Sequence, residues 1–260
     1  MHQQYIFSLE RRRRYRFFAG LNERQAMAQK QDLLLIPGLV CDSEVWRHQA
    51  AHLSDVATIA VPPVALGESI GEMARIVLDA APPNFALAGF SMGGYIALEM
   101  LRQAPDRITR LALLDTSARA DIPKKAEWRR SVIARCDKGE FPAVIDGMMP
   151  VLLHPDRQNG PLRQFVKAMA ARVGVEAFVR RQKAIGMRQD SRELLRSVSM
   201  PVRAICGRDD GMSTLEEHEE IAALSRRGRF SLIEQSGHMT IIEQPQAANA
   251  LLRDWLLYEA

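Results

Sequence analysis

The turn Gly89-Phe90-Ser91-Met92-Gly93 is the feature of this sequence that most constrains its fold. Residues 85–88 form a short apolar run that predicts a buried strand before the turn. Apolar residues after the turn recur at helical spacing, which predicts a helix from Gly94: Ile96, Ala97, Met100 and Leu101. A strand that passes into a helix through a serine needs small neighbours, because the two elements come close together and the serine backbone is strained.

The same turn indicates a chemical role for Ser91. A hydroxyl at the start of a helix lies near backbone N–H groups and the positive end of the helix dipole, which favour a developing negative charge. Glycine and serine are common residues, so the pattern also fits an ordinary strand-to-helix turn. A catalytic serine therefore requires a base, an orienting acid and oxyanion donors elsewhere in the chain.

The rest of the chain alternates between predicted strands and predicted helices, which indicates an α/β fold with a mostly parallel central sheet flanked by helices. The helix over 43–53 is expected to have Ser43 as its N-cap. The other predicted elements are strands at Leu33–Ile36, Thr58–Val61, Ile108–Leu114, Val202–Cys206 and Phe230–Ile233, and helices over 68–81, 94–104, 214–224 and 247–257. Ligands bind at the carboxyl ends of such strands, where Leu39, Ser91 and Asp115 all lie.

The alternation stops over residues 117–198, where the patterns are mostly helical and prolines at 142, 150, 155 and 161 are expected to separate short helices. We expect this segment to be a helical lid inserted into a core made of 31–116 and 199–260. Residues 1–30 are expected to be a basic, poorly ordered N-terminal extension.

Charge is distributed unevenly. Residues 1–30 carry seven Lys/Arg against two Asp/Glu, and residues 117–198 carry 17 against nine, on an otherwise acidic chain. Basic stripes interleaved with exposed aromatic residues are absent, so nucleic acid is not expected as a partner. The block Arg11-Arg12-Arg13-Arg14-Tyr15-Arg16 precedes no long apolar stretch, so we do not expect it to be part of a secretory signal. It fits either a disordered extension, with Met27 as an alternative start, or an arm for nucleic acid or a membrane surface.

Cysteine usage and hydropathy indicate the compartment. Cys41, Cys136 and Cys206 are widely spaced, which is neither a disulfide framework nor a zinc pattern. No run reaches the length of a membrane span. We expect a cytoplasmic protein with no membrane partner and no bound metal.

His238 is the best candidate for a base, because it follows Gly237 on the loop after the last predicted strand. For the acid, three aspartates follow strands: Asp115, Asp209 and Asp210. The order Ser91, Asp210, His238 is the order of nucleophile, acid and base in one known architecture. The other histidines fit packing or solvent roles: His48 and His52 lie four apart on a short helix, His218 is expected to be solvated, and His154 is a candidate to line the pocket.

Three segments together resemble the α/β-hydrolase fold family: Ile36-Pro37-Gly38-Leu39, Gly89–Gly93, and Ser236-Gly237-His238 with Gly207-Arg208-Asp209-Asp210. Within that family the chain looks most like small bacterial carboxylesterases and methyl esterases of the pimeloyl-carrier-protein type. The resemblance covers about residues 32–260 and implies that Asp210 is the acid. It also implies that the backbone N–H groups of Leu39 and Met92 form an oxyanion hole, and that no cofactor is needed. The first two strands usual in the family are missing or replaced by residues 1–30.

The expected activity is hydrolysis of a small-molecule carboxylic ester with a small to medium hydrophobic acyl group, through an acyl-enzyme. Substrate contacts are expected from Met148, Met149, Leu152 and His154. The basic lid fits an anionic acyl carrier as a partner or, alternatively, the solvated faces of amphipathic helices. Two other functions stay open: C–C hydrolysis, lyase or perhydrolase chemistry on the same triad, and ligand binding without catalysis.

Overall fold

A computed structural model of the chain describes residues 30–64 and 66–258. Its centre is a six-stranded sheet in the order β2-β1-β3-β4-β5-β6. The pairs from β1–β3 to β5–β6 are all parallel, with Leu35 opposite Ala88 and Ala88 opposite Ala112. The strands are β1 (Gln31–Ile36), β2 (Ala57–Ala60), β3 (Phe85–Phe90), β4 (Ile108–Leu114), β5 (Val202–Gly207) and β6 (Gly228–Ile233). The predicted α/β fold with a parallel sheet is confirmed.

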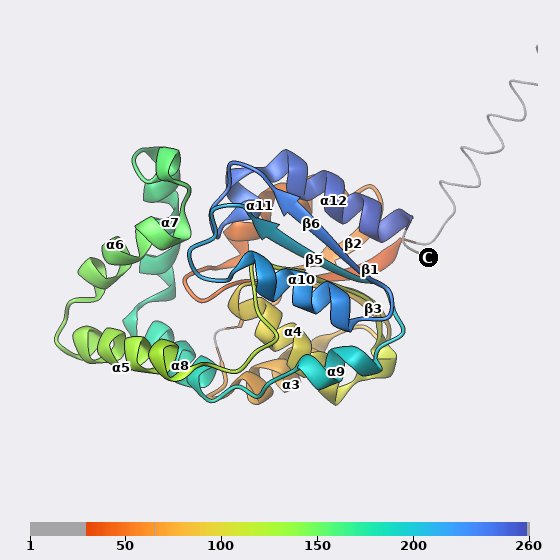
Figure 1. Cartoon of the computed structure of the whole chain (residues 1–260), viewed down its shortest axis with the longest axis horizontal. Coiled ribbons are helices and arrows are strands. Elements are labelled where there is room, and N and C mark those ends of the chain that lie inside the picture. The colour runs from red at the N-terminus through yellow and green to blue at the C-terminus, as the bar shows by residue number, and fades with distance from the viewer. Residues whose placement is uncertain (1–29, 65, 259–260) are drawn as a thin grey trace, which may run out of the picture. The chain divides into compact units, whose positions relative to one another are not determined.

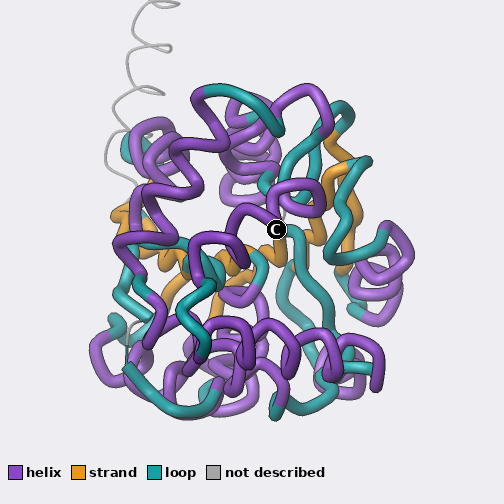
Figure 2. The backbone as a smooth tube through the Cα atoms, turned by 90° about the vertical axis from the view of Figure 1, so that its left-hand side faces the viewer, coloured by secondary structure: helices purple, strands orange, loops and turns teal. Residues whose placement is uncertain are grey.

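Helices cover both faces of this sheet, and Figure 2 shows the strands as a middle layer between them. In Figure 1, α3 (Ile70–Ala80) and α4 (Met92–Gln103) lie below the strands, and α11 (Thr240–Glu243) and α12 (Pro245–Leu257) lie above them. The helices of the core are α2 (Arg47–Leu53), α3 (Ile70–Ala80), α4 (Met92–Gln103), α10 (Leu215–Leu224), α11 (Thr240–Glu243) and α12 (Pro245–Leu257), with the 3-10 turns η1 (Ser43–Trp46) and η2 (Pro105–Arg107). The strands β3 and β5 are buried along their whole length, because helices cover both of their faces.

One local prediction about the first helix is wrong. The N-cap is Asp42 and not Ser43, since the Asp42 carboxylate accepts a hydrogen bond from the Glu44 N–H at 3.0 Å. The segment 43–53 is also two elements, because a 3-10 turn precedes α2. Ser and Asp are both good caps, and their adjacent positions could not be separated by sequence pattern.

Between β4 and β5 the chain forms helices only, and we call residues 117–198 the inserted segment. Its elements are α5 (Pro123–Asp137), α6 (Phe141–Leu152), η3 (Pro155–Arg157), α7 (Pro161–Val173), α8 (Val175–Gly186) and α9 (Arg192–Ser197). In Figure 1 the arrowheads of β5 and β6 point toward the side where α5 to α8 lie. Prolines 142, 155 and 161 lie in the first turns of their helices, but Pro150 does not break α6, contrary to expectation. Pro150 lies in the last turn, so the hydrogen bond to residue 146 that it removes affects only the end of the helix, which stops two residues later.

Within residues 30–64 and 66–258, no helix combines the length and the apolar character of a membrane span. The expectations for the basic extension over 1–30 concern residues that, apart from residue 30, are outside the described ranges.

Candidate active site

Ser91 lies at the tight turn between β3 and α4. Its backbone has φ 54° and ψ −118°, a region that residues with a Cβ rarely adopt. The Ser91 N–H donates to the Leu114 carbonyl (2.9 Å), and the Thr116 hydroxyl donates to the Ser91 carbonyl (2.8 Å). A Cβ on Gly93 would lie 2.1 Å from the Ile36 carbonyl oxygen, so this close approach of α4 and β1 requires glycine. The neighbouring strands therefore hold the serine hydroxyl at the carboxyl edge of the sheet.

His238 lies on the loop after β6 and joins Ser91 to Asp210. Its Nε2 lies 2.8 Å from the Ser91 Oγ, and its Nδ1 lies 2.9 Å from each carboxylate oxygen of Asp210. The imidazole is buried and packs on the Phe90 ring, with 5.6 Å between ring centroids. The three side chains thus form one hydrogen-bonded chain, which can move a proton from the hydroxyl to the imidazole.

Asp210 is held by its own loop, after the end of β5. Its carboxylate accepts hydrogen bonds from the Met212 N–H (2.7 Å), the Ser213 N–H (3.0 Å) and the Ser213 hydroxyl (2.6 Å). Burial by itself raises the pKa of Asp210, but the charge of His238 and the hydrogen bonds from His238 and Ser213 outweigh it and hold the pKa below its ordinary value. An ionised Asp210 can stabilise the imidazolium form of His238.

The other two aspartates considered for the acid have different surroundings. Asp209 points away, with a side chain that is 42% exposed and an oxygen 3.5 Å from the His154 Nε2. Asp115 is fully buried at the end of β4, where it accepts hydrogen bonds from the Gly207 N–H and from the Thr240 N–H and hydroxyl. Burial and the nearby charge of Asp210 raise its pKa well above the usual value. Asp115 therefore joins the backbones that carry Asp210 and His238, and it makes no hydrogen bond with the imidazole.

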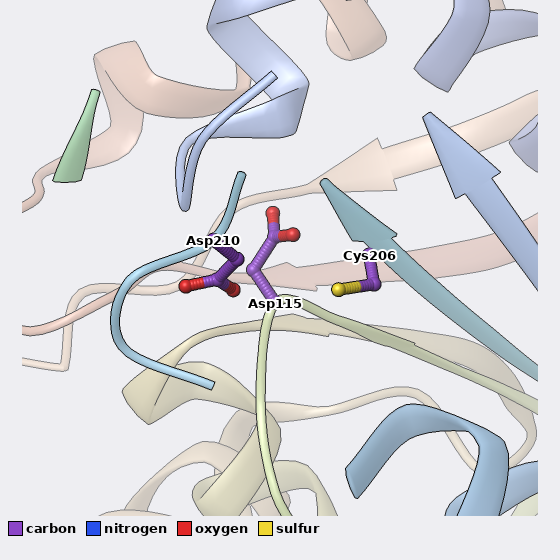
Figure 3. A group of neighbouring side chains, drawn as sticks. All are labelled: Asp115, Cys206 and Asp210. Atoms are coloured by element: carbon purple, nitrogen blue, oxygen red, sulfur yellow. The ribbon is translucent and has the colours of Figure 1, made fainter. Parts of the chain in front are cut away.

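Asp115, Cys206 and Asp210 lie close enough together to be considered as metal ligands. Figure 3 shows Asp115 between the other two side chains. All four carboxylate oxygens already accept N–H or O–H donors, and burial raises the pKa of the Cys206 thiol, so it stays protonated. This donor set suits a hydrogen-bond network and does not suit a cation, which requires free carboxylates and thiolate.

The loop after β1 approaches Ser91 from the other side. Its tight turn includes a hydrogen bond from the Cys41 N–H to the Gly38 carbonyl at 3.3 Å. A Cβ on Gly38 would lie 3.0 Å from the Phe90 ring and 3.3 Å from the Ser91 Cβ, so the loop contacts the serine turn directly. Leu39 follows Gly38 on this loop and Met92 follows Ser91, so both residues implied as oxyanion donors are next in sequence to the two residues in contact.

Glu243 supports the histidine loop and was not predicted from the sequence. Its buried Oε1 accepts hydrogen bonds from the N–H groups of Gly237 (2.9 Å) and Met239 (3.3 Å), which flank the histidine. Its Oε2 accepts one from the His154 N–H (2.8 Å) in the inserted segment. Burial raises its pKa despite these hydrogen bonds. In the sequence, Glu243 shows only that a glutamate follows His238 by five residues. That spacing does not indicate a contact unless the turn into α11 is known.

A cavity of about 510 Å³ opens beside Ser91 and His238. Its wall comes mostly from the inserted segment and is largely apolar, with Trp128 and Val132 of α5, Val144, Met148 and Val151 of α6, and Ile185 of α8. Four cationic residues of α5 also line it: Lys124, Lys125, Arg129 and Arg135. The cavity therefore offers an apolar space next to the hydroxyl, with cationic side chains on one side, three of which pair with carboxylates.

Of the four residues expected to contact substrate, only Met148 lines this cavity. Met149 and Leu152 are buried on the neighbouring stripe of α6, because Met148 shares its face with Val144 and Val151 at helical spacing. His154 caps η3 and contacts Asp209, outside the cavity. Apolar composition predicted a buried helix here, but it could not say which of its two apolar stripes faces the ligand.

The prediction that His218 is solvated is wrong. His218 is completely buried, its Nε2 accepts a hydrogen bond from the Thr116 N–H (2.9 Å), and its Nδ1 donates to the Thr214 carbonyl (2.8 Å). Burial lowers its pKa, so the neutral form is favoured. The buried Ile221 three residues later lies on the same helix face and was the signal that acidic neighbours concealed.

The sequence model for the alpha/beta hydrolase fold matches residues 68–245, which is more than half of the chain. The chain belongs to the alpha/beta hydrolase fold family. In this chain the fold carries a serine, a histidine and an aspartate in hydrogen-bonding contact at the carboxyl edge of its sheet.

Relatives of this alpha/beta hydrolase include named esterases. A pimeloyl-[acyl-carrier protein] methyl ester esterase of Vibrio cholerae is 24% identical over 86% of this chain and 93% of its own. An esterase of Mycobacterium tuberculosis is 27% identical over 70% of this chain and 63% of its own. Among solved structures, a thermophilic esterase from Thermogutta terrifontis, in a malate-bound structure, has a TM-score of 0.80 at 27% identity and covers 89% of this chain and 91% of its own. An enol-lactonase from Burkholderia xenovorans shares the fold at 20% identity, with a TM-score of 0.77 and coverage of 88% and 93%. The expectation of a hydrolase of the esterase type is confirmed at this level.

Proposed function

We propose that this hydrolase cleaves carboxylic esters through an acyl-enzyme formed on Ser91. The observation that supports this best is the unbroken hydrogen-bond chain from the Ser91 hydroxyl through His238 to Asp210, beside an apolar cavity. His238 takes the hydroxyl proton while Oγ bonds to the ester carbonyl carbon. The tetrahedral intermediate then collapses, the alcohol leaves with that proton, and water attacks the acyl-enzyme by the same route.

The oxyanion of this intermediate is proposed to bind the backbone N–H groups of Leu39 and Met92. Both residues are buried, Leu39 follows the glycine that contacts Ser91, and Met92 is the first residue of α4, where N–H groups lack helical partners. Each such donor lowers the barrier by roughly 3 kcal/mol. Because the proposed donors are main-chain N–H groups, the proline side chain at position 37 of the same loop takes no part in binding the oxyanion.

The inserted segment, residues 117–198, is proposed to act as a lid over a core of 31–116 and 199–260. It supplies most of the cavity wall, so its side chains set the size of the acyl group. A cavity of about 510 Å³ with apolar walls fits a small to medium hydrophobic acyl chain.

A more specific form of this proposal is that the ester substrate is joined to an acyl carrier. The relatives named pimeloyl-[acyl-carrier protein] methyl ester esterase act, by that name, on an ester joined to a carrier protein. The described residues that line the cavity include four cations and no carboxylate, which favours an anionic carrier or thioester. Three of the four already pair with carboxylates outside the lining, as Lys125–Glu217, Arg129–Asp121 and Arg135–Glu140, so this attraction is weakened. Ion pairs such as Arg163–Asp146 (2.8 Å) neutralise part of the segment's positive charge. Hydrolysis of a free methyl ester as fast as its carrier-bound form at low salt would count against the carrier.

The esterase proposal is tested with p-nitrophenyl esters from acetate to decanoate, with wild type, Ser91→Ala and the control Ser131→Ala. Ser131 lies on the exposed side of α5, where its hydroxyl donates to the Trp128 carbonyl. We expect turnover with a chain-length optimum in wild type and Ser131→Ala, and none in Ser91→Ala. Labelling of Ser91 by a fluorophosphonate without any ester turnover would redirect the assignment to C–C or lyase substrates. Neither turnover nor labelling would support a binding protein.

A further inference from the structure

Arg181 is a buried cation of the inserted segment that contacts the loop after β1. It lies in α8, and only 4% of it is exposed. Its Nη1 donates to the Leu39 carbonyl at 2.7 Å, and a longer contact reaches the Cys41 carbonyl at 3.4 Å. Within the described ranges no carboxylate forms an ion pair with it, and its Nε has no hydrogen-bond partner. Its hydrogen bonds thus go to main-chain carbonyls, and the Asp42 carboxylate acts on its charge only from beyond ion-pair distance.

Packing does not explain a guanidinium at this position. Burial lowers the pKa of Arg181, but a guanidinium starts so high that it keeps its charge. A buried charge whose partners are neutral is costly, and an apolar side chain of similar volume is commonly tolerated better. This cost in folding stability indicates that the contact between Arg181 and the Leu39 carbonyl serves the function of the protein and not its stability.

The contact acts on the peptide group that follows Leu39. The loop's own hydrogen bond, from the Cys41 N–H to the Gly38 carbonyl, is long at 3.3 Å. Gly38 is fixed against the Phe90 ring and Ser91, so the loop is held on its N-terminal side. Arg181 holds it on the C-terminal side, and together these contacts limit rotation of the peptide planes on both sides of Leu39.

We propose that Arg181 is a positioning residue that holds the Leu39 N–H in the direction of the oxyanion. This inference rests on the proposed ester hydrolysis. Ile185, one helical turn further along α8, lines the cavity, so the same helix contacts both the acyl space and the oxyanion loop. An acyl group that displaces α8 therefore also disturbs Leu39, and lowers kcat rather than only raising KM.

The test compares Arg181→Met and Arg181→Lys with the matched control Arg172→Met. Arg172 is also an arginine of the inserted segment, but it is about half exposed and pairs with the Asp42 side chain at 2.5 Å, one residue beyond Cys41. Three quantities are measured: kcat and KM for a p-nitrophenyl ester, inhibition by a trifluoromethyl ketone that forms a tetrahedral adduct on serine, and hydrogen exchange of the peptide spanning residues 36–42.

For Arg181→Met we expect kcat to fall about tenfold to a hundredfold, KM to change less than about threefold, and affinity for the ketone to fall by the same factor as kcat, because the lost interaction is made in the transition state. Hydrogen exchange of residues 36–42 should increase about tenfold. Arg181→Lys should recover part of each loss, and Arg172→Met should change each quantity less than about twofold.

Equal effects of Arg181→Met and Arg172→Met, or a loss in KM with kcat unchanged, would overturn the proposal. If Arg181→Met does not fold, the comparison is made between Arg181→Lys and Arg172→Met. If wild type hydrolyses no ester, the proposed function fails, and hydrogen exchange still decides whether Arg181 orders the loop. Unchanged exchange in the Arg181 variants then removes the inference as well.

Discussion

The backbone strain at Ser91 leads to a prediction that separates stability from chemistry. Both Ser91→Ala and Ser91→Gly remove the nucleophile, so neither should hydrolyse an ester. They differ in one respect, because alanine keeps the Cβ at φ 54°, ψ −118° and glycine removes it. We expect Ser91→Gly to be the more stable of the two.

The size of the difference follows from three contributions. A residue held in such a sparsely populated region costs about 1–3 kcal/mol, which glycine relieves. Glycine loses more backbone entropy on folding, which offsets about 0.5–1 kcal/mol. Full burial of a methylene stabilises a protein by ~0.8 kcal/mol, and Ser91 is only half-buried, so removal of its Cβ costs glycine a few tenths of a kcal/mol. The net is about 1 kcal/mol in favour of glycine, or ~2–4 °C in Tm for a domain of this size.

Urea unfolding of both variants, with equal m-values, gives the free-energy difference directly. Gln235 provides a control outside the proposed chemistry, because it is exposed and also has a positive φ of 53°. Gln235→Gly should likewise be more stable than Gln235→Ala. A Ser91→Ala variant as stable as Ser91→Gly would refute the argument that the serine turn stores strain.

Three further outcomes are expected. Asp210→Asn should lower kcat of ester hydrolysis by about 10⁴-fold with little change in KM, whereas Asp209→Asn should stay within about twofold in steady-state kinetics. Burial raises the pKa of Glu243, so the folded protein holds a proton on this side chain at pH values where the unfolded chain has lost it. The free energy of unfolding should therefore fall as the pH rises from about 4.3, the ordinary pKa of glutamate, through the higher pKa of the folded state. Urea unfolding from pH 4.5 to 7 should show this slope in wild type and a smaller one in Glu243→Gln. Gly147 lies inside α6, and a Cβ added to it would meet no atom within 4 Å, so Gly147→Ala should raise the free energy of unfolding by about 0.5–1 kcal/mol, measured in urea.

Local pattern was sufficient for most of the fold. The strand at Ile108–Leu114 begins and ends as predicted, and the helix predicted over 214–224 is α10, which begins one residue later at Leu215. These elements are continuous in sequence, and a buried parallel strand shows as an unbroken apolar run. Ser91 and His238 were predicted from the sequence, because each follows a strand and parallel strands bring their carboxyl ends to one edge. The same argument fits Asp115, Asp209 and Asp210 equally, so only the family resemblance indicated Asp210.

Contacts between distant segments were not accessible in this way. Arg181 and Leu39 are 142 residues apart, and nothing in either neighbourhood indicates the other. His218 was misjudged for the same reason, since its partner is the Thr116 N–H and its neighbours in sequence are acidic. The face of α6 that meets the cavity likewise depends on how α6 packs, and its sequence shows only that both stripes are apolar.

The near-contact of two loops limits how this hydrolase can be altered. A Cβ on Gly207 would lie 2.1 Å from the Gly237 carbonyl oxygen, so the backbones that precede Asp210 and His238 touch without an intervening side chain. A substitution in either loop will therefore shift the other, and the effects of paired substitutions there will not add. Libraries that aim to change the substrate range are better directed to cavity-facing positions of α5 and α6 such as Val132 and Val144. Side-chain volume can vary at those positions while Ser91, His238 and Asp210 keep their distances from one another.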